Sequence, residues 1–360
     1  MKYQDPNLCS KPKPNSESLA SGRLKVAFIY YSSLSSFIKN DYNILSRYFN
    51  VREVNIKSIR DMLELARSII WCDLSFVWFA GKHAFPAVIL SKLLMKKSIV
   101  VVGGYDVAYL PEINYGQFAS SWSNRMYAKF ALKYADKVLV VDPSLKEDAI
   151  RNANVDGRNF EYLPTGYNFS KFHPRGEKEN LVLTVAPGES WDRVRIKGVD
   201  IFVESAKYLP DIRFLVIGIQ GAALSKLKER ASPNTEFVGP ISQEELITYY
   251  QKAKVYCQLS MREGLPNALC EAMLCGCIPI GTERNGIPRA IGDIGFYVPY
   301  GDAEAVAHAI KGVMNAPNDL GKRARERIKH LFPEERRELG LVQAIRDCTK
   351  AHKKEYPPKL

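Results

Sequence analysis

Residues 255–273 read Val-Tyr-Cys-Gln-Leu-Ser-Met-Arg-Glu-Gly-Leu-Pro-Asn-Ala-Leu-Cys-Glu-Ala-Met. The first five residues predict a buried strand, and the residues after Pro266 predict the start of a helix. A helix amino terminus presents unpaired N–H groups and a partial positive charge, which suit a phosphate group. Glu263 precedes the predicted helix and Glu271 lies two turns into it. The stretch therefore predicts a phosphate site with two acids beside it, a combination that suggests recognition of hydroxyl groups.

Short β-branched runs alternate with helix-like segments on both sides of this stretch. The predicted strands are residues 24–30, 74–79, 99–102 and 138–141 in the first half, and 181–186, 214–218, 235–239, 255–259, 278–281 and 295–298 in the second. This alternation is typical of parallel sheets wound with helices. The pattern predicts an α/β fold of two Rossmann-like doubly wound domains that face each other across a cleft, where ligands of this architecture bind.

A chain of 360 residues fits two domains, at about 100–200 residues each. A polar stretch that contains Pro174 and Gly176 separates the two series of strands, and Pro333 interrupts the last helical segment. We expect a disordered leader at 1–22, domains at 23–170 and 181–335 joined by a linker at 171–180, and a final helix and tail at 336–360.

The formal net charge of +12 favours an acidic partner, which could be a phosphate-bearing substrate, anionic lipid or nucleic acid. Nucleic acid is not expected, because the chain lacks Arg/Lys-Gly-aromatic strings, zinc-knuckle spacing and a recognisable helix-turn-helix. Seven cysteines without framework spacing favour a reducing, cytoplasmic compartment. Cys275 and Cys277 are interpreted as packing thiols, and no metal site is predicted.

The pair of glutamates eight positions apart around Gly-Leu-Pro resembles the signature of retaining glycosyltransferases of the family 4 type, which have the GT-B fold. The segments 275–281 and 285–288 also match that family. The resemblance implies that Glu271 binds the ribose hydroxyls of a nucleotide sugar and that Glu263 contacts the donor sugar near its reacting carbon. It also implies that backbone amides of Gly264, Leu265, Pro266 and Asn267 line the sugar and diphosphate site.

A second match to the family is Val194-Arg-Ile-Lys-Gly-Val-Asp, where Lys197 would stabilise the leaving diphosphate without a metal cofactor. The arginine that usually accompanies this lysine is missing from the expected place upstream. Either Arg193 or Arg195 could supply the second cation, and we favour Arg195. Farther along, residues 237–246 resemble the segment that cradles the base, so Ile241 is expected to lie against it.

The first domain would bind the acceptor, and it departs from the family pattern. Gly103 stands where the family commonly has a histidine. Asp106 could then contact or deprotonate the acceptor, and Tyr105 could hydrogen-bond a sugar. A plain turn after a strand also explains these residues, and His83 is a further candidate for the acceptor side.

These features predict transfer of a sugar from a nucleotide diphosphate sugar to an acceptor hydroxyl with retention of configuration. A glycan or glycolipid acceptor is expected, in cell-surface polysaccharide or glycolipid assembly. A non-catalytic sugar-nucleotide-binding protein and an epimerase of the same fold remain as alternatives. Residues 1–170 carry 22 Lys and Arg against 15 Asp and Glu, a difference of +7, with Lys92, Lys96 and Lys97 grouped together. Peripheral contact with an anionic inner membrane surface is therefore expected.

Overall fold

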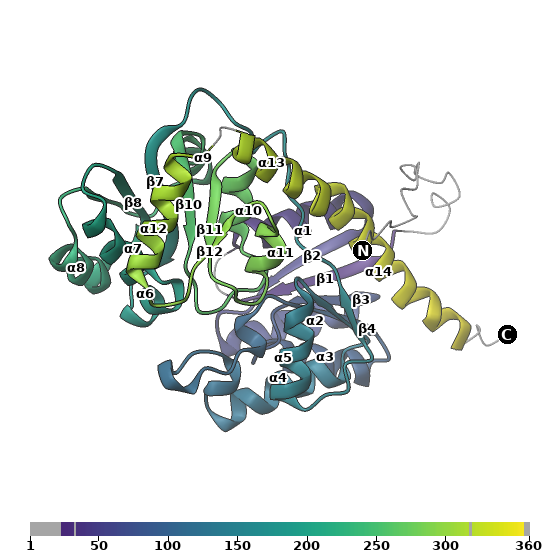
Figure 1. Ribbon diagram of the computed structural model, residues 1–360. Helices are drawn as coiled ribbons and strands as arrows, with labels where there is room; N and C mark the ends of the chain where they lie inside the picture. Colours follow the sequence, from purple (N-terminus) through teal and green to yellow (C-terminus); the bar gives the residue numbers. More distant parts are fainter. Residues whose placement is uncertain (1–22, 32–33, 317–318, 356–360) are drawn as a thin grey trace.

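The computed structural model describes residues 23–31, 34–316 and 319–355, so the expected leader at 1–22 lies outside the described residues. Two six-stranded sheets form two domains (Figure 1). The first sheet has the order β2-β1-β3-β4-β5-β6, and the second has the order β12-β11-β10-β7-β8-β9. The pairing is parallel throughout both sheets. The predicted fold class of two Rossmann-like domains is confirmed.

The ten predicted strands are present, each within two residues of its expected ends. The strands are β1 Lys25–Tyr30, β2 Asn50–Asn55, β3 Leu74–Trp78, β4 Lys97–Val102, β5 Lys137–Val140, β6 Phe160–Tyr162, β7 Glu179–Gly188, β8 Arg213–Ile219, β9 Thr235–Val238, β10 Ala253–Gln258, β11 Ile278–Gly281 and β12 Phe296–Tyr297. The two strands that were not predicted, β2 and β6, lie at the edges of the first sheet. They have fewer apolar residues because an edge strand is only partly covered.

Helices cover both sheets and follow the strands in the order expected of doubly wound domains. The α-helices are α1 Ser36–Tyr48, α2 Met62–Trp71, α3 Ala84–Leu93, α4 Trp122–Tyr134, α5 Pro143–Ala153, α6 Trp191–Lys197, α7 Val199–Ser205, α8 Gly221–Arg230, α9 Gln243–Lys252, α10 Asn267–Leu274, α11 Ile287–Ile291, α12 Ala303–Met314, α13 Asp319–Leu331 and α14 Glu334–Glu355. Five short 3-10 turns complete the described elements: Ile59–Asp61, Tyr105–Val107, Pro111–Ile113, Gln117–Ala119 and Ala206–Tyr208.

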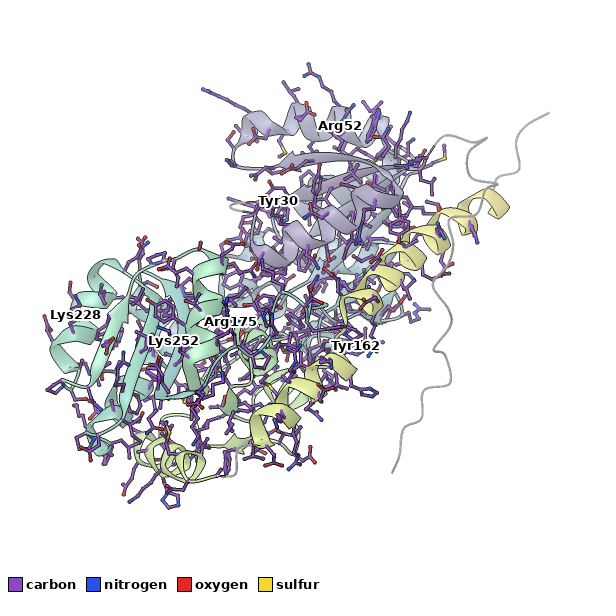
Figure 2. All side chains as sticks on the ribbon, turned by 90° about the horizontal axis from the view of Figure 1, so that it is seen from above. Tyr30, Arg52, Tyr162, Arg175, Lys228 and Lys252 are labelled. Atoms are coloured by element: carbon purple, nitrogen blue, oxygen red, sulfur yellow. The ribbon has the colours of Figure 1, made fainter. Side chains whose placement is uncertain are left out.

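The last helix, α14, returns from the second domain and packs along the first, as the view of Figure 2 shows. Its Arg337 is 1% exposed and bonds both carboxylate oxygens of Asp41 in α1, at 3.0 and 2.6 Å. Arg337 also donates to the Leu163 carbonyl oxygen, and the indole of Trp78 donates to Asp41. A buried ion pair between Arg337 and Asp41 thus joins α14 to the first domain.

The loops after β4 and β10 meet between the domains. A Cβ atom added at Gly264 would lie 2.3 Å from the Gly103 carbonyl oxygen, and one added at Gly104 would lie 3.3 Å from the Gly264 nitrogen. Glycine is therefore required at Gly264 to let the two backbones approach. This contact brings the carboxyl ends of the two sheets together beside Glu263.

Candidate functional site

Glu263 stands at the centre of a polar cluster at the carboxyl end of β10. Its Oε1 accepts hydrogen bonds from Gln258 at 3.0 Å and from Ser260 at 2.8 Å, and it forms an ion pair with Lys197. The Glu263 and Lys197 side chains are only 12% and 15% exposed. Burial lowers the pKa of the Lys197 ammonium, although the Glu263 charge acts in the opposite direction. Two residues predicted from separate motifs are therefore in direct contact.

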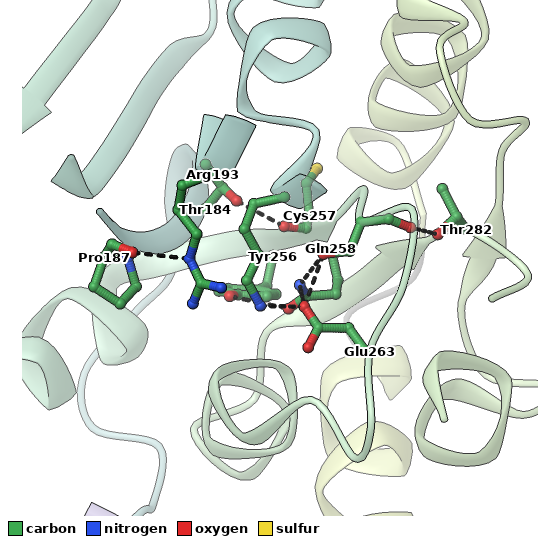
Figure 3. Close-up of polar contacts among 10 residues, drawn as sticks. Thr184, Pro187, Arg193, Tyr256, Cys257, Gln258, Glu263 and Thr282 are labelled. Atoms are coloured by element: carbon green, nitrogen blue, oxygen red, sulfur yellow. Dashed lines mark hydrogen bonds and ion pairs between the residues drawn. The ribbon is translucent and has the colours of Figure 1, made fainter. Parts of the chain in front are cut away.

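Arg193, and not Arg195, accompanies Lys197. Both Arg193 and Lys197 lie on α6, four residues apart and so on one face of that helix. Figure 3 shows Arg193 bonded to the Pro187 carbonyl oxygen, to which its Nε donates at 3.1 Å. The Arg193 charge also acts on the Lys197 ammonium. Arg195 is exposed, and its charge acts on Asp200 and Tyr300 outside this cluster. The structure thus favours Arg193 over the predicted Arg195 as the companion of Lys197, because a two-residue step turns a helical side chain to the opposite face.

Glu271 lies on α10 and is 7% exposed. It accepts hydrogen bonds from the Gln243 amide at 3.1 Å and from the Tyr250 hydroxyl at 3.4 Å. Burial raises the pKa of the Glu271 carboxyl to about 7, against the lowering effects of Gln243, Lys171 and Tyr250. Gln243 and Tyr250 come from α9, which the sequence analysis did not connect with this glutamate.

Asn267 begins α10 and is tied to the segment that joins the two domains. Its Oδ1 accepts hydrogen bonds from Thr165 at 3.0 Å and from the Tyr167 hydroxyl at 2.6 Å. Leu265 is 5% exposed and belongs to the core, and Pro266 precedes the helix in an extended conformation. The predicted loop of residues 264–267 thus lies at the helix start, held between the domains.

Asp106 has a structural role that the sequence analysis did not foresee. The side chain is 2% exposed and accepts hydrogen bonds from the backbone N–H groups of Ala80, Gly103 and Gly104. Burial raises its pKa, and these three donors counter that effect. Asp106 therefore holds the loop after β4, and the expectation that it contacts or deprotonates the acceptor stays a prediction.

His83 is packed inside the first domain. The side chain is 2% exposed, and its Nε2 lies 2.7 Å from the Trp78 carbonyl oxygen. Burial lowers the pKa of the imidazole to about 4. Tyr115, also in the first domain, is half-buried, and its ring packs edge-on against Tyr105. Burial raises the pKa of Tyr115 to about 12, so it is a neutral hydrogen-bonding group.

Ile241 lies in the loop before α9, half-buried against the core, where it could contact a base bound near Glu271. Within residues 23–31, 34–316 and 319–355, no three His, Cys, Asp or Glu side chains are grouped so that they could hold a metal ion. Lys197, Arg193 and the α10 amino terminus supply the positive charge of this cluster.

The site lies between two Rossmann-like domains. Lys197, Arg193, Glu263 and Glu271 lie near the carboxyl ends of the strands of the second sheet. This arrangement defines the class of two-domain GT-B proteins. Crystal structures agree with that class: Anabaena Alr3699/HepE in complex with UDP and glucose has a TM-score of 0.75 at 13% identity, covering 91% of this chain and 100% of that one.

Sequence comparisons support a family resemblance. Residues 168–330 match the model for glycosyl transferases group 1. The chain is 22% identical over 264 residues to a phosphatidylinositol N-acetylglucosaminyltransferase protein of Arabidopsis thaliana, covering 70% of this chain and 58% of that protein. It is 29% identical over 206 residues to the putative colanic acid biosynthesis glycosyltransferase WcaL of Escherichia coli K12, covering 50% of each. The carboxyl-terminal part of the chain is therefore similar to the group 1 glycosyltransferases, in agreement with the predicted resemblance to the family 4 type with the GT-B fold.

The alignments cover only part of those relatives. The chain spans 58%, 45% and 50% of the length of the first three curated relatives that it matches. The comparisons therefore support the fold and a family resemblance of residues 168–330, whereas the reaction of this chain has to be argued from its own residues.

Proposed function

We propose that this protein transfers a glycosyl group from a nucleotide diphosphate sugar to an acceptor hydroxyl, with retention of anomeric configuration. The observation that carries the proposal is the contact between Lys197 and Glu263 beside the amino terminus of α10. A buried lysine, an arginine and a helix amino terminus at one point form a site for a diphosphate. In this proposal Glu271, on the same helix, accepts hydrogen bonds from the ribose hydroxyls.

In this mechanism the bond between the anomeric carbon and the diphosphate oxygen breaks, and negative charge builds on the departing nucleotide. Lys197 and Arg193 stabilise that charge, in a site where burial strengthens electrostatic interactions. The acceptor oxygen forms its bond to the same face of the anomeric carbon, and its proton passes to the departing phosphate oxygen. Glu263 orients the donor sugar, and no covalent intermediate on the protein is required.

We further propose that the protein needs no metal cofactor for this reaction, because its own cations face the diphosphate. The expected result is that EDTA leaves the transfer rate unchanged. Loss of activity in EDTA, with recovery on addition of Mg²⁺ or Mn²⁺, would contradict this part of the proposal.

The first experiment is a thermal-shift screen of the full chain against UDP, GDP and ADP sugars, repeated with Glu271→Ala. UDP sugars come first, because the structurally similar HepE was solved with UDP. Stabilisation by one nucleotide that Glu271→Ala abolishes is expected, with Glu229→Ala as an exposed control. No shift from any donor would overturn the proposal, and binding without donor turnover would indicate a sugar-nucleotide-binding protein instead.

Retention is tested separately from donor binding. Once a donor is identified, the product glycoside is examined by NMR, and the coupling constant of its anomeric proton is compared with that of the donor. The same configuration in both is the expected outcome. An inverted product would exclude the same-face mechanism while leaving the donor site intact.

The acceptor is proposed to be a glycan or glycolipid of cell-surface assembly. Two similar proteins carry such settings in their names, since one is named for phosphatidylinositol and the other for colanic acid biosynthesis. No helix in the described part of the chain is long and apolar enough to cross a membrane.

The end of α3 is the proposed membrane contact. Leu93, Leu94 and Met95 are 73%, 41% and 64% exposed, and Lys92 and Lys96 flank them. Apolar side chains between lysines match a surface of anionic headgroups over hydrocarbon. Lys97, the third lysine of the expected group, forms an ion pair with Asp136, with 3.2 Å between Nζ and Oδ1. It is therefore not part of this surface.

Membrane contact is tested by sedimentation with phosphatidylglycerol and phosphatidylcholine vesicles. Binding to the anionic vesicles that falls with added salt is expected, and Leu93→Ser with Met95→Ser should weaken it. Leu339→Ser, at an exposed site on α14, is the control. Equal binding to both kinds of vesicle, or equal binding by the variants, would contradict this location.

A further inference from the structure

Three buried polar residues of β10 and the loop after it lead to Glu263. Tyr256 and Gln258 are two residues apart on β10, so their side chains lie on the same face of the sheet, and Ser260 follows two residues later. The exposed fractions of the three residues are 0%, 4% and 0%. Buried polar side chains need hydrogen-bond partners, and these three find theirs in one another and in Glu263.

The hydrogen bonds of this group run in one direction, toward a single carboxylate oxygen. The Tyr256 hydroxyl donates to Gln258 Oε1 at 3.4 Å, which turns the amide nitrogen of Gln258 toward Ser260. Gln258 Nε2 donates to Ser260 Oγ at 2.8 Å and to Glu263 Oε1 at 3.0 Å (Figure 3). Ser260 Oγ donates to the same Oε1 at 2.8 Å. Two neutral donors therefore converge on Oε1 of Glu263.

Lys197 is the third donor to this oxygen, through its ion pair with Glu263. An ammonium group has three N–H donors, so Lys197 keeps two of them for a diphosphate. Glu263 Oε2 accepts no hydrogen bond within the described residues, yet it is not fully buried. One oxygen of the carboxylate is thus occupied by the protein, and the other is left as an acceptor for a ligand.

The backbone of the segment is held by other groups. The Thr282 hydroxyl donates to the Ser260 carbonyl oxygen at 2.6 Å, and the Met261 N–H group donates to the Ile196 carbonyl oxygen at 2.9 Å. The side chains of Gln258 and Ser260 take no part in these bonds. Removal of either side-chain donor should therefore release the Glu263 carboxylate while the loop keeps its place.

We propose that Gln258 and Ser260 are positioning residues that hold Glu263 Oε1 and so direct Oε2 toward the donor sugar, where it accepts a hydrogen bond from a sugar hydroxyl. The inference rests on the proposed binding of a nucleotide diphosphate sugar. A carboxylate held by several donors at one oxygen is oriented before the ligand arrives, which lowers the entropy cost of binding.

The two parts of the donor molecule then depend on different residues. The diphosphate faces Lys197, Arg193 and the amino terminus of α10, whereas the sugar meets Glu263. Neither Gln258 nor Ser260 forms a hydrogen bond with Lys197 or Arg193 in the described part of the chain. Loss of a positioning residue should therefore weaken binding of a nucleotide sugar but not of the nucleotide diphosphate alone.

Isothermal titration calorimetry of the full chain tests this difference. UDP is compared with UDP-glucose and UDP-N-acetylglucosamine, GDP with GDP-mannose, and ADP with ADP-glucose. Gln258→Leu and Ser260→Ala should each weaken binding of the nucleotide sugar about tenfold and leave the affinity for the nucleotide diphosphate unchanged. Ser260→Thr keeps the hydroxyl group and should retain the affinity of the unmodified protein for both.

Thr184→Val is the matched control, because it removes another buried hydroxyl group that is bonded to β10. Thr184 is 4% exposed, and its Oγ1 donates to the Cys257 carbonyl oxygen at 3.0 Å, without a bond to Glu263. Both affinities should be those of the unmodified protein. A selective loss of nucleotide-sugar binding in this control would show that the whole strand, and not the position of Glu263, determines the effect.

The remaining outcomes separate this inference from the proposed function. Equal weakening of nucleotide and nucleotide sugar in Gln258→Leu and Ser260→Ala, or no change in either, would overturn the inference and leave the proposed function standing. Retained binding of the nucleotide diphosphate shows that a variant is folded, and if Gln258→Leu does not fold, the comparison of Ser260→Ala with Ser260→Thr decides. If the unmodified protein binds none of these molecules, the proposed function fails and the inference fails with it.

Discussion

At the scale of single residues, Glu271 combines burial with a proposed role in binding. Burial raises its pKa from 4.5 to about 7, so the folded protein holds a proton that the unfolded chain releases at lower pH. Stability should therefore fall as the pH rises from about 4.5 through 7. We predict that Glu271→Gln raises the free energy of unfolding at pH 8, by on the order of 1–3 kcal/mol, and changes it little near pH 5.

Urea denaturation at the two pH values measures this effect. Glu229→Gln, an exposed position on α8, should show no comparable dependence. A gain for Glu271→Gln that is equal at both pH values would show that relief of the buried charge is not its cause. The same variant should bind nucleotide sugars more weakly, since an amide cannot replace a carboxylate as a double acceptor for ribose hydroxyls.

At the scale of secondary structure, the position of α6 decides which arginine serves the site. The helix begins at Trp191, so Arg193 and Lys197 share a face, and Arg195 is exposed on another. We predict that Arg193→Ala lowers kcat/KM by about 10²-fold, the effect typical of removing one donor to a developing anion. Arg195→Ala should remain close to the unmodified protein in steady-state kinetics with the identified donor.

Circular dichroism melting of both variants controls for loss of the helix. Arg193 Nε also donates to the Pro187 carbonyl oxygen at 3.1 Å, so a small fall in melting temperature is expected for Arg193→Ala alone. A larger loss of kcat/KM in Arg195→Ala than in Arg193→Ala would identify Arg195 as the second cation and contradict the proposed role of Arg193.

At the scale of the whole molecule, α14 packs against the first domain and contacts α1, which lies far from it in sequence. Arg337 and Asp41 are separated by 296 residues in sequence, yet they form a buried ion pair under Trp78. Removing one partner of such a pair leaves a buried charge uncompensated. We predict that Arg337→Ala lowers the free energy of unfolding by about 3–5 kcal/mol, measured by urea denaturation.

Arg346→Ala provides the matched control, because Arg346 is an exposed arginine on the same helix. Its effect should lie within about 0.5 kcal/mol. Equal losses in the two variants would mean that the helix itself, and not the pair with Asp41, determines the change.

The sequence by itself determined the two series of strands, the fold class and the half of the site that surrounds α10. These features are local, since apolar runs of strand length and a helix start beside two glutamates are visible in consecutive residues. Glu263 and Glu271 stand out in this stretch, whereas Lys197 and the roles of all three residues were predicted from the family resemblance and stay predictions. The edge strands β2 and β6 were not predicted, because partly exposed strands carry a weaker apolar signal.

Only the tertiary structure decided what each polar group faces. Asp106 turned out to be buried under three backbone donors, and Gln243 and Tyr250 came to the site from an element distant in sequence. The pairing of Asp41 with Arg337 and the ion pair of Lys197 with Glu263 belong to the same group. The physical reason is that burial and hydrogen bonding depend on contacts between distant segments, whereas periodicity reports only on neighbours along the chain.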